Sequence, residues 1–144
     1  MSLTRRFGQS LLVIVPVGLA GSWVVGSMAI LGINWNVLTI MIIALTIGLG
    51  IDYSIHVWRR FESNRAKGMG IWTAMEEMYT TTGSSLLLSA GTTISGFLVL
   101  VLSPVPVIRD FGLVSSISVA FSLILALLVL PGLLAAEFRT NGSK

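Results

Sequence analysis

The sequence has no cysteine, a single histidine and few charged side chains, since only 10% of its 144 residues are Asp, Glu, Lys or Arg. Without cysteine there is neither a disulfide framework nor a thiolate metal site. One histidine with scattered carboxylates does not supply the set of ligands that a zinc site needs, and no nucleophile is placed for a hydrolase. We therefore expect no metal, no cofactor and no enzyme activity.

Apolar side chains, by contrast, are abundant. Hydrophobic residues make up 54% of the chain, and its mean hydropathy is +0.92. A helix crosses the hydrocarbon with about 20 apolar residues, so residues 1–144 have room for about four spans in a single transmembrane module. We predict an all-α integral membrane protein in contact with membrane lipids. The net charge of +3 comes from cations in the polar segments, so we expect no nucleic-acid partner.

Apolar runs and turn residues place the predicted helices. We predict four transmembrane helices, over residues 7–31, 37–58, 81–102 and 108–136. Residues 59–80 form a polar cytoplasmic loop, and its second part has the spacing of a short cytoplasmic amphipathic helix in the interface. The apolar face of that helix carries Ile71, Ala74, Met75 and Met78, opposite Glu76 and Glu77. In the last span, Pro131-Gly132 predicts a kink or an early end.

Lysine and arginine lie almost entirely on one side of the predicted bundle. That side holds Arg5, Arg6, Arg59, Arg60, Arg65, Lys67, Arg139 and Lys144, whereas the other side holds Arg109. Positively charged loops stay in the cytoplasm, so both termini and the loop over residues 59–80 are predicted to be cytoplasmic. We expect a multi-pass protein of the inner, cytoplasmic cell membrane.

An ionisable residue lies deep in the second predicted span. In the run Gly48-Leu49-Gly50-Ile51-Asp52-Tyr53-Ser54-Ile55-His56, Asp52 precedes Arg59 by seven residues, or about 10 Å of helix rise. A carboxylate at that depth costs on the order of 3 kcal/mol, so Asp52 must face a partner, reach water or be protonated. Two interpretations follow: Asp52 loads and releases a proton, or it merely ties helices together.

Residues next to Asp52 extend this candidate site. His56 follows Asp52 by one helical turn and shares its face, so it either continues a proton path towards the cytoplasm or is an ordinary interfacial histidine. Tyr53 points about 100° away around the helix and is expected to serve a different partner. Gly48 and Gly50 are predicted to allow close packing of another helix.

The third predicted span offers a face that could meet Asp52. Hydroxyl-bearing and small residues recur there at spacings of three and four residues: Ser85, Ser89, Thr92, Thr93 and Gly96. The stripe either hydrogen-bonds or hydrates Asp52, or it serves packing alone, since hydroxyls in membrane helices also bond to their own backbone. Gly91 and Gly96 add positions for close packing.

Together these residues resemble the membrane core of the resistance-nodulation-division (RND) superfamily, closest to its MMPL-type, hydrophobe-exporter branch. The matching signatures are Gly48 to His56, Arg60 with Glu62, Gly91 to Phe97, Phe111-Gly112 and Leu130-Pro131, in the family's order. The resemblance implies that the predicted helices are the third to sixth helices of one transporter half. It also implies that proton flux drives the export of lipids or other hydrophobic molecules.

By the same resemblance, Asp52 and Tyr53 match the family's Asp-Tyr proton relay, and Ser89, Thr92 and Thr93 match the hydroxyl-bearing helix that faces it. The family completes its relay with residues of the other half. We therefore expect a partner, either a second RND-like half or another copy of this chain, and expect Tyr53 to reach it. The alternative is a sterol-sensing-like module that binds lipid or supports membrane assembly without transport.

Overall fold

The computed structural model is a bundle of long helices, and it describes the backbone of residues 3–141 and the side chains of residues 14–135. Its elements are α1 (Leu3–Leu31), α2 (Val37–Ala66), α3 (Ile71–Met78), the π-helix η1 (Tyr79–Gly83), α4 (Ser84–Leu100) and α5 (Pro106–Asn141). In this part of the chain, four helical stretches are long and apolar enough to cross a membrane. The predicted all-α fold with four spans is therefore confirmed.

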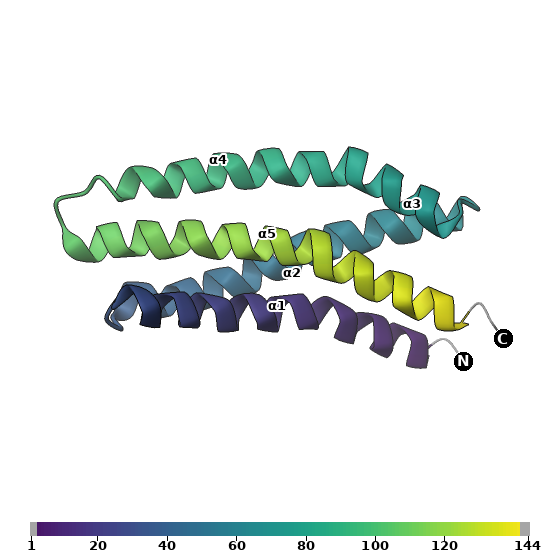
Figure 1. Ribbon diagram of the computed structural model, residues 1–144, viewed down its shortest axis with the longest axis horizontal. Coiled ribbons are helices and arrows are strands. Elements are labelled where there is room, and N and C mark those ends of the chain that lie inside the picture. Colours follow the sequence, from purple (N-terminus) through teal and green to yellow (C-terminus); the bar gives the residue numbers. More distant parts are fainter. Residues whose placement is uncertain (1–2, 142–144) are drawn as a thin grey trace.

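Helix α5 is the centre of the bundle. It packs against α1, α2 and α4, whereas α4 lies at the edge and buries only Leu86 and Ala90. Figure 1 shows that α1 begins and α5 ends at the end of the bundle where α2 connects to α3. The connections α1–α2 and α4–α5 lie at the other end. The arrangement keeps the two terminal segments on one side.

Of the cations behind the predicted orientation, the side chains at positions 5, 6, 139 and 144 lie outside the described residues.

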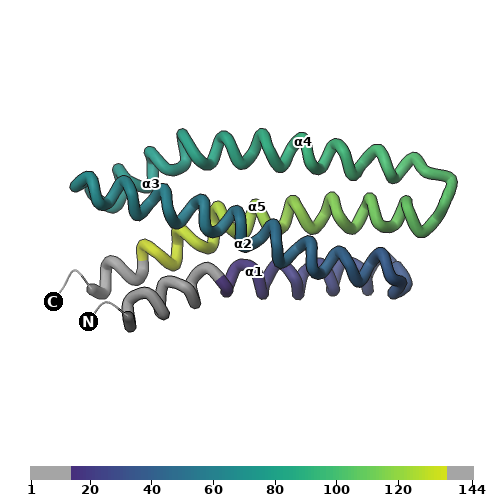
Figure 2. Tube along the Cα trace, turned by 180° about the vertical axis from the view of Figure 1, so that it is seen from behind, coloured from purple at the N-terminus to yellow at the C-terminus, as the bar shows by residue number. Residues whose placement is uncertain are grey.

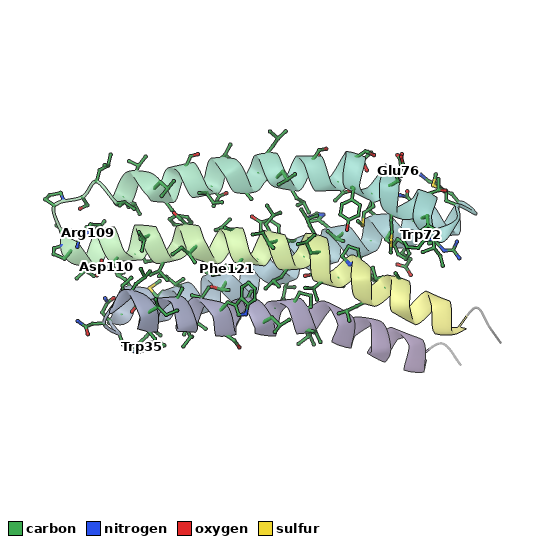
Figure 3. The ribbon with its side chains drawn as sticks, viewed as in Figure 1. Trp35, Trp72, Glu76, Arg109, Asp110 and Phe121 are labelled. Atoms are coloured by element: carbon green, nitrogen blue, oxygen red, sulfur yellow. The ribbon has the colours of Figure 1, made fainter. Side chains whose placement is uncertain are left out.

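Tryptophan side chains mark both ends of the bundle. Figure 3 shows Trp35 at the end that also carries Arg109 and Asp110, and Trp72 beside Glu76 at the other end. Trp35 is 57% exposed and Trp72 is 75% exposed. Exposed tryptophan is typical of the two interfaces of a membrane, so these residues delimit the apolar part of the bundle.

The second span continues further than predicted. Helix α2 ends at Ala66 and not near Trp58, and the chain then turns at Gly68, whose φ of +84° favours glycine. The added turns are held by packing, since Phe61 is 1% exposed and the Asn64 side chain donates to the Ala74 carbonyl at 3.1 Å. Charged residues indicate where a helix leaves the hydrocarbon, but they do not end it.

The predicted interfacial helix is also not separate from the third span. Helix α3 leads through η1 directly into α4, so residues 71–100 form one helical stretch. Its predicted apolar face is correct, because Ala74, Met75 and Met78 are buried. The polar run after Met78 stays helical as the π-helix η1. Its hydroxyls bond to carbonyls of the preceding turn, and the Thr81 hydroxyl donates to the Glu77 carbonyl at 2.6 Å.

Helix α5 also runs past Pro131, where we predicted a kink or an end. A proline has no N–H, so Pro131 leaves the carbonyl of Leu127 without its helical donor. The Tyr79 hydroxyl of η1 donates to that carbonyl at 2.7 Å and replaces the missing bond. Figures 1 and 2 show that α5 changes direction along this C-terminal part while it stays helical.

This replacement can be tested with a double-mutant cycle. Tyr79→Phe is expected to lower the free energy of unfolding by about 1 kcal/mol, because the Leu127 carbonyl loses its donor. In a Pro131→Ala background the same change should cost much less, since the N–H of residue 131 then bonds to that carbonyl. Reversible unfolding in mixed micelles measures both values. Equal costs in the two backgrounds would show that Tyr79 does not compensate for the proline.

Candidate functional site

The Asp52 side chain lies on the outside of the bundle. Helix α2 buries one stripe of side chains: Thr39, Ile42, Thr46, Gly50, Tyr53, Ser54, Val57, Phe61 and Asn64. Asp52 and His56 are both exposed and share the opposite side of the helix. Among the described residues the Asp52 carboxylate has no hydrogen-bond or ion-pair partner. The other helices therefore pack against the face of α2 that lies opposite Asp52. The carboxylate of Asp52 is left on the outside of the bundle.

A groove of about 450 Å³ begins beside His56. It lies between α2 and the η1–α4 segment and is lined by His56, Arg60, Thr81, Thr82, Ser85, Leu86 and Ser89. Most of these side chains are polar, and Arg60 sits nearest to the cation-rich end of the bundle. Arg60 also forms an ion pair with Glu77 of α3 at 3.2 Å, which ties the two walls of the groove together. Water can reach His56 through this polar groove.

Tyr53 does not take the position that we predicted for it. Its ring is 5% exposed and belongs to the main apolar cluster, with Val57, Met78 and Leu86 among its members. The expectation that Tyr53 reaches a partner half is therefore wrong for this arrangement. The physical reason is rotation: the step of about 100° from Asp52 turns Tyr53 back into the protein's own core.

The threonine hydroxyls of α4 form hydrogen bonds within their own helix. Thr92 and Thr93 both donate to the Ser89 carbonyl, at 2.8 and 3.0 Å. Ser89 lines the groove with His56, but neither it nor the two threonines hydrogen-bonds to Asp52. Helix α4 packs on α5, so the predicted meeting of its hydroxyl stripe with Asp52 does not occur within the described residues.

The four glycines that we predicted to allow close packing differ in the space around them. A Cβ on Gly50 would lie 3.3 Å from Val17 of α1, so Gly50 does allow close approach. At Gly48, Gly91 and Gly96 an added Cβ would meet no described atom within 4 Å. Close packing within this part of the chain is therefore confirmed for Gly50 alone.

Gly112 is the tight contact that the prediction missed. A Cβ there would lie 2.6 Å from the Phe97 carbonyl oxygen and 2.7 Å from the Leu100 Cβ. Beside it the rings of Phe97 and Phe111 meet edge to face, with centroids 5.9 Å apart. The dipeptide Phe111-Gly112 is one of the sequence signatures that resemble the RND superfamily. This signature pointed to Gly112, but no role in helix packing was predicted for it.

The candidate site holds titratable side chains one helical turn apart. Among the described residues, His, Asp and Glu side chains do not gather in groups of three or more as metal ligands would. What the site offers is one carboxyl group, an imidazole one turn away and a polar groove. A carboxyl group in a span can bind and release a proton when its surroundings change.

Fold and site together define a multi-pass membrane module with an ionisable outer face. The model of the MMPL family matches residues 8–141, and the chain belongs to this family. The resemblance predicted from the signatures is thus confirmed.

Several relatives agree with this assignment. The chain is 38% identical over 135 residues to MJ1562 of Methanocaldococcus jannaschii, whose name describes it as a membrane protein. It is 30% identical over 132 residues to human protein patched homolog 2 and 30% identical over 109 residues to protein patched homolog 1 of Caenorhabditis elegans. These alignments cover 94%, 85% and 75% of this chain. No solved structure matches the chain significantly.

The chain corresponds to a small part of each relative. Its alignment spans 35% of the Methanocaldococcus protein, 11% of the human protein and 8% of the Caenorhabditis protein. Most of each relative therefore lies outside the part aligned with this chain.

Proposed function

We propose that this chain is a membrane module of an RND-type, proton-driven exporter of lipids or other hydrophobic compounds. In this proposal it lies in the inner membrane with both termini in the cytoplasm, and a second RND-like half or another copy covers its outer face. Asp52 binds and releases the transported proton, and His56 hands protons to it. The observation that carries the proposal is the exposure of Asp52 on a face of α2 that the bundle leaves uncovered.

A partner follows from the cost of that exposure. A charged carboxylate facing lipid costs on the order of 3 kcal/mol, and membrane proteins place such groups against other helices or in water. Along the same face, Gly48 leaves room beside the helix, one turn before Asp52. A helix of the partner can therefore approach α2 closely at Asp52 and exclude lipid from it.

The groove supports a direction for the proton. It leads from the cation-rich end, at Arg60, to His56, which is one helical turn from Asp52. Water in a polar groove can carry protons to an imidazole, which can bind and release them. In the proposed orientation this end is cytoplasmic, so the groove connects His56 with the cytoplasm.

The alternative function is a lipid-binding module that does not transport. One observation favours it, an apolar groove of about 670 Å³ between α1 and α2. Its lining residues are Ile14, Val17, Gly18, Gly21, Ser22, Val25, Ile43, Ile47 and Ile51. An acyl chain or sterol would fit such a surface by apolar contact alone. In this alternative Asp52 is a helix-packing contact and does not carry a proton.

Cysteine labelling tests whether a partner covers the Asp52 face. Because the chain has no cysteine, Gly48→Cys and Ile124→Cys each introduce a single thiol. Both positions are exposed. Ile124 is two residues from Ser122 of α5, which lies against Gly50 of α2, so the two positions are close in depth. We expect a membrane-permeant maleimide to label both thiols in the isolated chain, and to label only Ile124→Cys well in membranes of the native host. Equal labelling of both thiols in those membranes would contradict a partner on this face.

A further inference from the structure

A third groove, of about 590 Å³, opens between the α3–η1 segment and the C-terminal part of α5. On each wall, lining residues follow one another at spacings of four and three residues, so each wall is one face of a helix. These residues are Trp72, Glu76 and Tyr79 on one wall, and Leu128, Gly132 and Ala135 on the other. The groove shares no lining residue with the polar groove beside His56 or with the apolar groove between α1 and α2.

The groove runs from one end of the bundle towards its middle. Helix α3 leads away from the end where α2 connects to α3, and α5 runs back towards it, as Figure 1 shows. Trp72 and Ala135 therefore form the outer end of the groove. Tyr79 and Leu128 form the inner end, where the Tyr79 hydroxyl donates to the Leu127 carbonyl. From Leu128 to Ala135 the groove follows about 10 Å of helix rise.

The outer part of the groove holds a carboxylate beside an indole ring. Among the described residues, the carboxylate of Glu76 has no hydrogen-bond or ion-pair partner, whereas the neighbouring Glu77 pairs with Arg60. Trp72 precedes Glu76 by one helical turn, and Figure 3 shows both at the same end of the bundle. Of the aromatic side chains, tryptophan attracts cations most strongly. A positively charged group in this part of the groove can contact both side chains.

The inner part of the groove is open and largely apolar. Leu128 is 66% exposed. A Cβ on Gly132 would meet no described atom within 4 Å, so the backbone of α5 lies bare along this wall. An alkyl chain can lie here and remove apolar surface of both walls from contact with other molecules.

We propose that this groove binds one membrane lipid with an ammonium headgroup, of the kind found in phosphatidylethanolamine. The ammonium group contacts Glu76 and Trp72, and the first part of an acyl chain lies along Gly132 and Leu128. A lipid matches the groove because exposed tryptophan marks the headgroup level of a membrane, and the groove becomes apolar further inward. The volume lies within the range of small-molecule sites. This inference does not rest on proton-driven transport.

Native mass spectrometry of the whole chain tests the proposal. The chain is released from micelles that contain equal amounts of phosphatidylethanolamine and phosphatidylglycerol, which has no ammonium group. We expect one bound phosphatidylethanolamine, several-fold more frequent than bound phosphatidylglycerol. Equal retention of the two lipids would overturn the proposal.

Charge variants test the headgroup contact. Glu76→Gln removes the carboxylate and is expected to reduce retention of phosphatidylethanolamine to that of phosphatidylglycerol. The matched control is Glu62→Gln, because Glu62 is also exposed but lies on α2 and does not line the groove. The control should keep the preference for phosphatidylethanolamine. A preference that survives in Glu76→Gln would contradict recognition of the ammonium group in this groove.

A second variant pair tests whether the lipid lies in the groove itself. Gly132→Leu fills the inner part and is expected to abolish lipid retention. Gly91→Leu is the control, since Gly91 lies on α4 and an added Cβ there would also meet no described atom within 4 Å. The same spectra report dimers. A lipid-free dimer that only Gly132→Leu converts to monomer would show that a second copy occupies the groove, and would overturn the proposal.

Discussion

Replacing Asp52 with asparagine is expected to reduce proton-coupled transport by the assembled transporter to background. Asparagine has nearly the same shape as aspartate but cannot bind and release a proton at its side chain. Because Asp52 is exposed and makes no contact to another charged group among the described residues, the variant chain should fold normally. The measurement is proton flux, followed with a pH-sensitive dye in proteoliposomes that contain the complex purified from its host.

The control for this variant is Asp110→Asn. Asp110 lies at the opposite end of the bundle, 3.9 Å from Arg109, where a carboxylate can reach water. Removing its charge should leave flux close to that of the unchanged complex. Unaltered flux in Asp52→Asn would rule out the relay role. Loss of the complex itself in Asp52→Asn would favour the other interpretation, in which Asp52 ties this chain to its partner.

Gly112→Ala is expected to destabilise the bundle by about 3 kcal/mol, because overpacking of a tight interface forces the helices apart. The added Cβ would overlap the Phe97 carbonyl oxygen, at 2.6 Å, and the Leu100 Cβ, at 2.7 Å. A backbone carbonyl oxygen and a Cβ atom cannot move aside as the end of a flexible side chain can. Helix α4 must shift away from α5, which also separates the Phe97 and Phe111 rings.

The free energy of unfolding in mixed micelles measures this effect. Gly132→Ala is the matched control, since it lies on the same helix and its new Cβ would meet no described atom within 4 Å. We expect the control to be neutral or slightly stabilising, because alanine favours helix more than glycine does. Equal stability of the two variants would show that α4 and α5 do not meet closely at Gly112.

The sequence predicted the position of some residues correctly and that of others incorrectly. The depth of Asp52 in its span followed from its distance to Arg59, and the face that it shares with His56 followed from the helical period. That the same period turns Tyr53 into the core was not predictable, because α3 and α4 had first to be placed against α2. Likewise Pro131 indicated a kink or an end of the helix, and only the approach of the Tyr79 hydroxyl to the Leu127 carbonyl explains why α5 continues.

The sequence by itself determined the four spans, the family and the presence of a carboxylate at membrane depth. These are properties of single segments, because a stretch of about 20 apolar residues must be helical in lipid whatever surrounds it. The tertiary structure alone decided that α5 is central, that Gly112 meets α4, that a groove opens between the α3–η1 segment and α5 and that Asp52 is left outside. Such features depend on which faces of different helices meet, and that is fixed by packing between segments far apart in the chain.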